Sequence, residues 1–291
     1  MIERFVDVAD YVSPSKLTDF VINPYVGCPH ACRYCYACFM KRFTNHLEPW
    51  GDFLDVKRCS KPLGVKRLSG KSVFMSSVTD PYNPAEARYG VTRRILEELA
   101  PIDCELTITT KSNLILRDLD LLVERNERFS QESQNDVLRE RSLIDDEARN
   151  LTLQRPKLRV VASINTLDED FRADMDSASP ISARLDVLKT FKENGIANAL
   201  FMSPIFPFVT DVWAIIERAK SFVDQIWFEN LNLRPGYKED ILAYIRARFP
   251  QYYADYLDIY RRGDRSYWDA LKEHIIDFCE KNGVSYEIFF H

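Results

Sequence analysis

The chain alternates short apolar runs with longer segments in which apolar residues recur every three or four positions. Apolar runs that end at Gly, Pro or Asp are typical of buried strands, and the longer spacing is typical of helices. Six runs predict strands, over residues 19–26, 72–78, 105–110, 158–164, 199–205 and 225–231. The segments between them predict helices over residues 86–99, 117–125, 182–194 and 212–222.

Regular alternation of strand and helix argues for parallel strands joined by right-handed crossovers. Six strand-helix units are fewer than the eight of a closed TIM barrel. The pattern therefore predicts an α/β fold in the form of a partial, six-unit (β/α)6 TIM-type barrel, with an open doubly wound sheet as the alternative. The first strand would deliver the loop that follows it to the carboxyl end of the barrel, where active sites lie.

The pattern changes at two places along the chain. Residues 126–156 are rich in Glu, Arg, Gln, Ser and Asp, which predicts a charged, solvated insertion with a helix around 136–150. From about residue 236 the pattern indicates helices, over 238–262 and 266–281, and a last apolar run at 284–290 fits one more strand. We therefore expect a partial-barrel domain over 1–235, in which 1–18 are a polar lead-in, and a C-terminal helical extension over 236–291.

Composition narrows the class of protein. A chain of 291 residues with 46% hydrophobic content can bury a full core. No 18 apolar residues run together, and the first residues are polar, so the sequence predicts neither a membrane span nor a signal peptide and indicates a reducing cytoplasm. The net charge of -5 argues against non-specific coating of nucleic acid, although a local basic groove stays open.

Four of the seven cysteines lie within residues 27–38. Cys28, Cys32 and Cys35 have the spacing Cys-x3-Cys-x2-Cys, and three thiolates leave one iron of a four-iron cluster open for another ligand. A zinc knuckle using His30 and Cys38 is an alternative, but it lacks a second, distant pair of ligands. A ferredoxin-like site with Cys38 as fourth ligand is another, although its spacing differs. The odd number of cysteines disfavours a disulfide framework.

The cysteine spacing, with Tyr34 just before the third cysteine, resembles the signature of radical S-adenosylmethionine (SAM) enzymes. Further motifs resemble one branch, the spore photoproduct lyase-like group, also described as DNA repair photolyase-like. The resemblance covers residues 25–232 and includes Thr79-Asp80-Pro81, Thr110-Lys111-Ser112, Ser163-Ile164-Asn165 and Ser182-Ala183-Arg184.

The resemblance implies a 4Fe–4S cluster on Cys28, Cys32 and Cys35, whose open iron binds SAM. Reductive cleavage of SAM would give a 5′-deoxyadenosyl radical that abstracts hydrogen from a substrate, as in the lyase-like repair of a DNA photoproduct. It also implies an electron donor of the flavodoxin or ferredoxin type and a macromolecular substrate, which is DNA, RNA or protein. The alternatives are radical modification of a protein, peptide or RNA, and a non-catalytic iron–sulfur protein.

The same resemblance implies which residues bind SAM: Tyr34, Thr79, Asp80, Lys111, Ser163, Asn165 and Arg184. Lys111 offers a charge to the SAM carboxylate, and Ser163 and Asn165 offer hydrogen bonds to its ribose or methionine moiety. A surface salt bridge or a strand-end turn is the alternative role for these three. Arg184 begins a helix, where a cation is unfavourable unless SAM or a nearby acid faces it.

The candidate catalytic residues are Tyr34, Tyr36 and Cys38. Photoproduct-reversing members carry a hydrogen-donor Cys two positions before the Ser or Thr of the Thr79-Asp80 motif, and Ser77 stands at that position. A hydroxyl is a much poorer hydrogen-atom donor than a thiol. The resemblance therefore supports SAM chemistry more strongly than reversal of thymine dimers, and Cys38 is the one spare thiol near the cluster.

Overall fold

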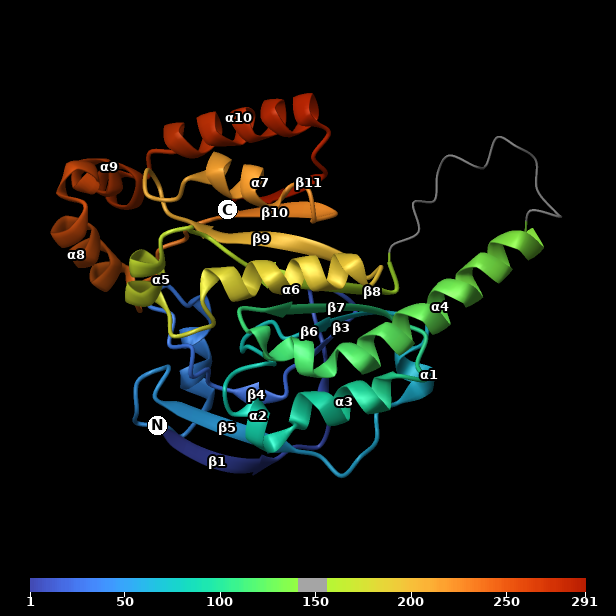
Figure 1. Ribbon diagram of the computed structural model, residues 1–291. Helices are drawn as coiled ribbons and strands as arrows, with labels where there is room; N and C mark the ends of the chain where they lie inside the picture. Colours follow the sequence, from blue (N-terminus) through green and yellow to red (C-terminus); the bar gives the residue numbers. More distant parts are fainter. Residues whose placement is uncertain (141–155) are drawn as a thin grey trace.

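The computed structural model describes residues 1–140 and 156–291, and the side chains of 130–140 lie outside this description. Its centre is an eight-stranded sheet in the order β11-β10-β9-β8-β7-β6-β3-β2 (Figure 1). The strands are β2 (Val12–Pro14), β3 (Phe20–Ile22), β6 (Ser72–Met75), β7 (Glu105–Thr110), β8 (Leu158–Ser163), β9 (Ala197–Ile205), β10 (Gln225–Asn230) and β11 (Tyr286–Phe289). All neighbours from β3 to β11 pair in parallel, and β2 pairs antiparallel to β3.

This sheet is curved into part of a barrel. Thr18, which precedes β3, and Phe289 of β11 lie at opposite edges of the sheet, yet both line one cavity. Within the described residues the two edges do not pair with each other, so the barrel stays open. The predicted α/β partial barrel is confirmed. Its sheet contains seven parallel strands, because the last apolar run pairs with β10.

Helices cover the convex face of the sheet, where α3, α4, α6, α7 and α10 run alongside the strands (Figure 1). No helix within the described residues is both long and apolar enough to span a membrane. The α-helices are α1 (Val65–Leu68), α2 (Glu86–Tyr89), α3 (Val91–Leu99), α4 (Leu119–Glu140), α5 (Glu169–Met175), α6 (Ile181–Glu193), α7 (Val212–Ala219), α8 (Lys238–Arg248), α9 (Tyr253–Leu257) and α10 (Ser266–Asn282). The 3-10 helices are η1 (Tyr36–Phe43), η2 (Asn113–Asp118) and η4 (Pro250–Tyr252), and η5 (Asp258–Arg262) is a π-helix.

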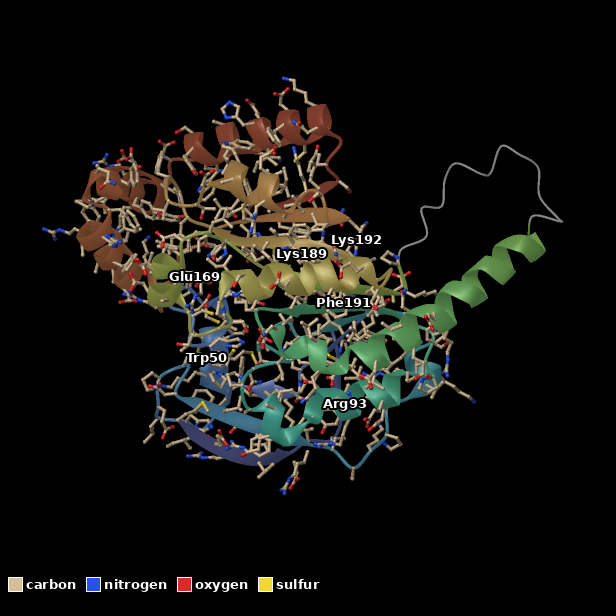
Figure 2. All side chains as sticks on the ribbon, viewed as in Figure 1. Trp50, Arg93, Glu169, Lys189, Phe191 and Lys192 are labelled. Carbon is tan, nitrogen blue, oxygen red and sulfur yellow. The ribbon has the colours of Figure 1, made fainter. Side chains whose placement is uncertain are left out.

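The alternation along β7 separates the core from the cavity. Leu106 and Ile108 are buried and belong to the same apolar core as Ile95 and Leu99 of α3, whereas Thr107 and Thr109 line the cavity. Burial of one such aliphatic side chain contributes about 1.5–3 kcal/mol. Phe191 of α6 joins this core beside α4 (Figure 2). The apolar core that stabilises the fold therefore lies on the convex side of the sheet, and the cavity lies on the concave side.

The N-terminal prediction was wrong in two respects. Residues 1–18 are not a polar lead-in, because β1 (Ile2–Asp7) pairs with β5 (Phe53–Arg58) in a second, three-stranded sheet, and β2 lies at the edge of the main sheet. The strand predicted over 19–26 is two strands, because β3 stays in the main sheet and β4 (Tyr25–Val26) pairs with β5. Pro24 stands between them, and its missing N–H cannot continue a ladder.

Several predicted helices are divided or joined differently. The helix predicted over 86–99 is broken at Gly90, whose φ of 59° ends α2 and precedes α3. The helix predicted over 238–262 is interrupted near Pro250 into four segments. The helix α4 runs on to Glu140, so the start of the helix predicted around 136–150 belongs to it, and residues 141–150 lie outside the described residues. The C-terminal segment is not helical throughout, since it ends in β11.

Candidate functional site

The cysteine loop opens onto a cavity of about 750 Å³ on the concave face of the sheet. Cys28, Cys32 and Cys35 all line this cavity, and all three are free thiols. The loop follows β4 and leads into η1, beside the carboxyl ends of β6, β7 and β8. The cavity is within the size range of small-molecule sites in proteins.

Tight backbone turns give the cysteine loop its shape. Gly27 has a φ of 86°, and a Cβ at this position would lie 2.3 Å from the carbonyl oxygen of Phe53 in β5. Two turns follow, in which Ala31 N–H donates to the Cys28 carbonyl and Cys35 N–H to the Cys32 carbonyl, each at 3.1 Å. The hydroxyl of Thr79 donates to the Gly27 carbonyl at 2.7 Å and ties the loop to the end of β6. The backbone therefore fixes where the three thiols lie.

The three thiols fit an iron–sulfur cluster by their chemistry. Burial raises the pKa of Cys28 well above its ordinary value, and the neighbouring Asp80, Cys32 and Cys35 raise it further. Burial also raises the pKa of Cys32 to about 12. Cluster assembly would take up these thiols as thiolates and release their protons. Among the side chains that the structure describes, no three of His, Cys, Asp or Glu are grouped to hold a single metal ion.

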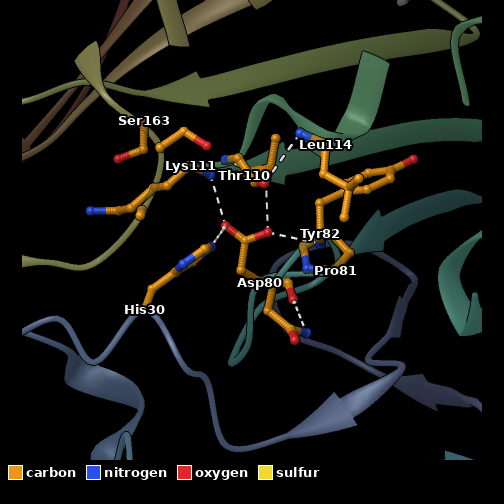
Figure 3. Close-up of polar contacts among 12 residues, drawn as sticks. His30, Asp80, Pro81, Tyr82, Thr110, Lys111, Leu114 and Ser163 are labelled. Atoms are coloured by element: carbon orange, nitrogen blue, oxygen red, sulfur yellow. Dashed lines mark hydrogen bonds and ion pairs between the residues drawn. The ribbon is translucent and has the colours of Figure 1, made fainter. Parts of the chain in front are cut away.

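Asp80 is the centre of a buried network behind the cysteine loop (Figure 3). Its Oδ1 accepts hydrogen bonds from the Thr110 hydroxyl at 2.7 Å and the Tyr82 N–H at 2.9 Å. Its Oδ2 accepts the Lys111 N–H at 2.7 Å and lies 3.2 Å from His30 Nε2. Burial alone would raise the pKa of Asp80, but His30 and these donors outweigh it and lower the pKa. Asp80 thus fixes both the cysteine loop and the backbone of Lys111.

A second buried network joins Lys111 to Arg184. The Lys111 ammonium donates to the Tyr34 hydroxyl and lies 3.6 Å from Asp176 Oδ2. Tyr34 also donates to Asp176, at 3.1 Å, and Arg184 donates to Asp176 Oδ1 at 2.6 Å. Burial would raise the pKa of Asp176, but Lys111 and Arg184 outweigh it and lower the pKa to about 2. The Asp176 carboxylate therefore pairs with both Lys111 and Arg184 beside the cysteine loop.

Tyr36 covers the position where the sequence departs from the lyase-like pattern. Its hydroxyl donates to the carbonyl of Ser77, and both residues line the cavity. The amide of Ser77 donates to the Asn23 side chain at 3.0 Å. Tyr36 is 44% exposed, so its ring lies at the mouth of the cavity and not in its depth.

The remaining predicted residues divide between the cavity and the surrounding structure. Ser163 lines the cavity and donates to the Ser203 carbonyl at 3.1 Å. Asn165 is buried behind it, where its amide donates to the Pro204 carbonyl at 3.2 Å, and it is not among the lining residues. Arg184 is also outside the lining, and the nearby acid that its position required is Asp176. Cys38 packs against Gly236 instead, with its Sγ 3.3 Å from where a Cβ would lie.

The sequence has a close relative among curated proteins, while no protein-family model matches it. It is 35% identical over 246 residues to the uncharacterized protein MJ0683 of Methanocaldococcus jannaschii, a match that covers 83% of this chain and 82% of the relative. The chain belongs to the family of this archaeal protein.

Two solved structures identify the fold of the family. SuiB of Streptococcus suis, solved with bound S-adenosylmethionine, matches with a TM-score of 0.52 and 15% identity, over 93% of this chain and 49% of SuiB. Spore photoproduct lyase, complexed with dinucleoside spore photoproduct, matches with a TM-score of 0.50 and 14% identity, over 85% of this chain and 66% of the lyase. The chain therefore has the fold that these two structures share, which is the fold that the sequence resemblance implied, and it spans about half of SuiB and two thirds of the lyase.

Sequence reasoning missed several residues that lie in the cavity or beside it. The sequence indicated Asp176 only indirectly, because Arg184 near the start of α6 required a nearby acid. Glu229 stands near the end of β10, where it accepts a hydrogen bond from the Ser203 hydroxyl, and the alternation of this strand places it on the same face as Trp227. Arg234 lines the cavity from the loop after β10 and had no signal in the pattern.

Proposed function

We propose that this chain is a radical SAM enzyme. The observation that carries the proposal is the meeting of three free thiols, on the Cys-x3-Cys-x2-Cys loop, with Lys111, Thr79 and Ser163 around one cavity. A 4Fe–4S cluster on Cys28, Cys32 and Cys35 would bind SAM at its open iron and supply the electron that cleaves SAM to a 5′-deoxyadenosyl radical. The relatives' fold supports this assignment.

The residues of the chain would orient SAM and exclude water from it. Lys111 is preorganised, because its backbone is held by Asp80 and its ammonium by Tyr34 and Asp176, so it can present its charge to the SAM carboxylate at little entropic cost. Ser163 and Thr79 offer hydroxyl groups at the ends of β8 and after β6. We assign Arg184 and Asn165 to positioning, since their polar atoms hold Asp176 and the backbone of β9 at Pro204.

The substrate would occupy the inner side of the sheet. Phe201, Trp227 and Phe289 pack edge to face there, with ring centroids 5.8 to 6.2 Å apart, and form an aromatic wall opposite the polar ends of the strands. Such a wall suits a flat or apolar substrate group. Spore photoproduct lyase was solved with a dinucleoside photoproduct and SuiB with the precursor peptide SuiA. Our first candidate substrate is a DNA photoproduct. The second is a protein, peptide or RNA that the enzyme would modify.

We also propose that the enzyme works in the cytoplasm, because its seven cysteines are all free thiols and a reducing compartment keeps them so. We propose a flavodoxin- or ferredoxin-type protein as its electron donor. The partial barrel over 1–235, followed by the 236–291 extension, remains our proposal for its domains.

Cluster content tests the proposed function directly. Anaerobically reconstituted protein should contain about four iron and about four sulfide per chain, and the variant Cys32→Ala should lose most of both. Cys38→Ala is the matched control and should keep them, because Cys38 packs against Gly236 outside the cavity. Stoichiometric zinc without sulfide would contradict the proposal, and loss of the cluster in Cys38→Ala would favour a four-cysteine site.

Irradiated DNA tests the substrate. We expect the reduced enzyme to cleave SAM in its presence and to restore little thymine, because the position of the donor thiol is held by Ser77. Mass spectrometry of the DNA and of 5′-deoxyadenosine separates the outcomes. Efficient repair by the unaltered protein would contradict this expectation and point to Tyr36 or Cys38 as the donor, while SAM cleavage with untouched DNA would favour the peptide, protein or RNA substrate.

A further inference from the structure

The segment directly after the cluster cysteines exposes apolar side chains. Phe39 and Phe43 of η1 are 37% and 67% exposed, and Leu47 in the following loop is 92% exposed. Large apolar groups gathered on one exposed segment indicate an interaction surface more often than isolated ones do. The exposed residues are few, so a transient partner fits them better than a permanent one.

The charge of this segment is opposite to that of the chain. Residues 36–47 contain Lys41 and Arg42 and no acidic residue, whereas the chain as a whole has a net charge of -5. The Arg42 guanidinium lies 5.5 Å from the ring centre of Phe39 and 4.6 Å from that of Phe43. The positive charge of Arg42 therefore lies against the exposed rings, and the segment is complementary to a negatively charged surface.

Trp50 lies in the connection that leads from this segment to β5. Trp50 is itself partly exposed, and its ring packs against Phe53 at 5.6 Å. The next residue, Gly51, lies so close to Ala31 that a Cβ would come within 2.8 Å of the Ala31 Cβ. The loop that carries Trp50 therefore packs against the cysteine loop. Figure 2 labels Trp50 in this part of the molecule.

We propose that Phe39, Lys41, Arg42, Phe43 and Leu47, here called the entry patch, dock a small acidic one-electron carrier protein, whose electron reaches the cluster through Cys35, the residue directly before η1. This inference rests on the proposed function and adds a docking face to it. In each encounter the carrier is oxidised by one electron and the cluster is reduced by one electron, with no atom transferred. The carrier then leaves, which the small, salt-sensitive patch permits.

Both features of the patch favour an electron carrier over a nucleic acid. Two cations are few for a phosphate backbone, which needs several Lys or Arg contacts for binding at physiological salt. An apolar centre flanked by cations suits instead a protein whose redox group is exposed among acidic residues. The patch also lies where such a partner must dock, because η1 begins directly after the cluster ligand Cys35.

The test uses anaerobic holoenzyme and reduced flavodoxin as the probe. The rate at which the visible absorbance of the cluster bleaches is measured at low and high ionic strength, and 5′-deoxyadenosine formation is measured in parallel. Arg42→Glu reverses a patch charge and Phe43→Ser removes an apolar contact. Lys66→Glu, at an exposed lysine of α1 outside the entry patch, is the charge-matched control. Dithionite replaces flavodoxin in a second series, because it needs no docking face.

We expect Arg42→Glu to slow flavodoxin-driven bleaching about tenfold at low salt, and high salt to slow the unaltered protein toward the same rate. Phe43→Ser should slow it at both salt concentrations, whereas Lys66→Glu and the dithionite series should be unchanged. Equal rates for Arg42→Glu and Lys66→Glu would overturn the entry patch. A cluster that dithionite bleaches without cleaving SAM would contradict the proposed function alone, and the bleaching rates would still decide the docking face. A chain that assembles no cluster would overturn both.

Discussion

Asp176 holds together the charged residues that lie beside the cysteine loop. Its carboxylate and the Arg184 guanidinium are each 1% exposed and 2.6 Å apart, and the Lys111 ammonium lies 3.6 Å from the same carboxylate. Breaking a buried ion pair leaves an uncompensated charge in the interior. Asp176→Asn should therefore lower the free energy of unfolding by about 3–5 kcal/mol in urea titrations. Asp186→Asn removes an exposed carboxylate of α6 and should change it by less than about 0.5 kcal/mol.

The same carboxylate gives a pH dependence with a defined sign. Lys111 and Arg184 outweigh the effect of burial and lower the pKa of Asp176 from 3.8 to about 2. Because it ionises more easily in the folded chain, its contribution to stability is complete above pH 3.8 and is lost as the pH falls through about 2. The difference in unfolding free energy between the unaltered protein and Asp176→Asn should shrink over that range. A difference that grows as the pH falls would refute the assigned partners.

A variant of Lys111 tests the proposed contact between this residue and the SAM carboxylate. Lys111→Ala removes a charge-assisted hydrogen bond to the SAM carboxylate and should weaken binding by about 1.5–3 kcal/mol in calorimetry of the reconstituted protein. Lys189→Ala, on the exposed face of α6, is the control. Unchanged SAM affinity in Lys111→Ala would return Lys111 to a purely structural partner of Tyr34 and Asp176.

Among the elements, the cysteine loop depends on β5 for its place. Gly27→Ala should destabilise the fold by more than about 2 kcal/mol and impair cluster assembly, because the new Cβ would meet the Phe53 carbonyl at 2.3 Å and its φ is 86°. Gly70→Ala is a matched control, since Gly70 has a φ of 70° but nothing within 4 Å. It should show only the cost of the left-handed backbone, about 1 kcal/mol. Equal losses in both variants would show that contact with β5 does not position the loop.

Some elements could be predicted from the pattern and others could not. The alternation from Glu105 to Thr110 predicts β7 to the residue, because one face of it packs on α3 and the other faces the cavity. The small sheet escaped prediction because β1 and β5 pair across about fifty residues, a partnership that local periodicity does not encode. Likewise Gly90 divides a helix whose apolar spacing continues through it.

Prediction of the site depended on whether a residue's role is local. The cysteine spacing and the positions of Lys111 and Ser163 at strand ends are visible in the sequence, and the structure brings them to one cavity. Cys38 follows the same spacing, but η1 turns it toward Gly236 and away from the cavity. Asp176 could not be found from its own surroundings, because its role comes from Arg184 and Lys111 in other elements.

The open barrel gives the whole molecule a cavity that is rigid and yet accessible. Its convex face is covered by helices, while its concave face stays open between β2 and β11 within the described residues. The thiols lie at the carboxyl ends of the strands and the aromatic wall lies further along the inner face. A reactive group formed at the cysteine loop would therefore face a substrate held by the sheet itself.

We propose that this chain cleaves SAM reductively at a cluster on Cys28, Cys32 and Cys35. Chromatography can detect 5′-deoxyadenosine and methionine after anaerobic incubation of the reconstituted protein with dithionite and SAM. We expect both products in equal amounts from the unaltered protein and neither from Cys32→Ala. Intact SAM after incubation with a protein that has been shown to carry its reduced cluster would contradict it.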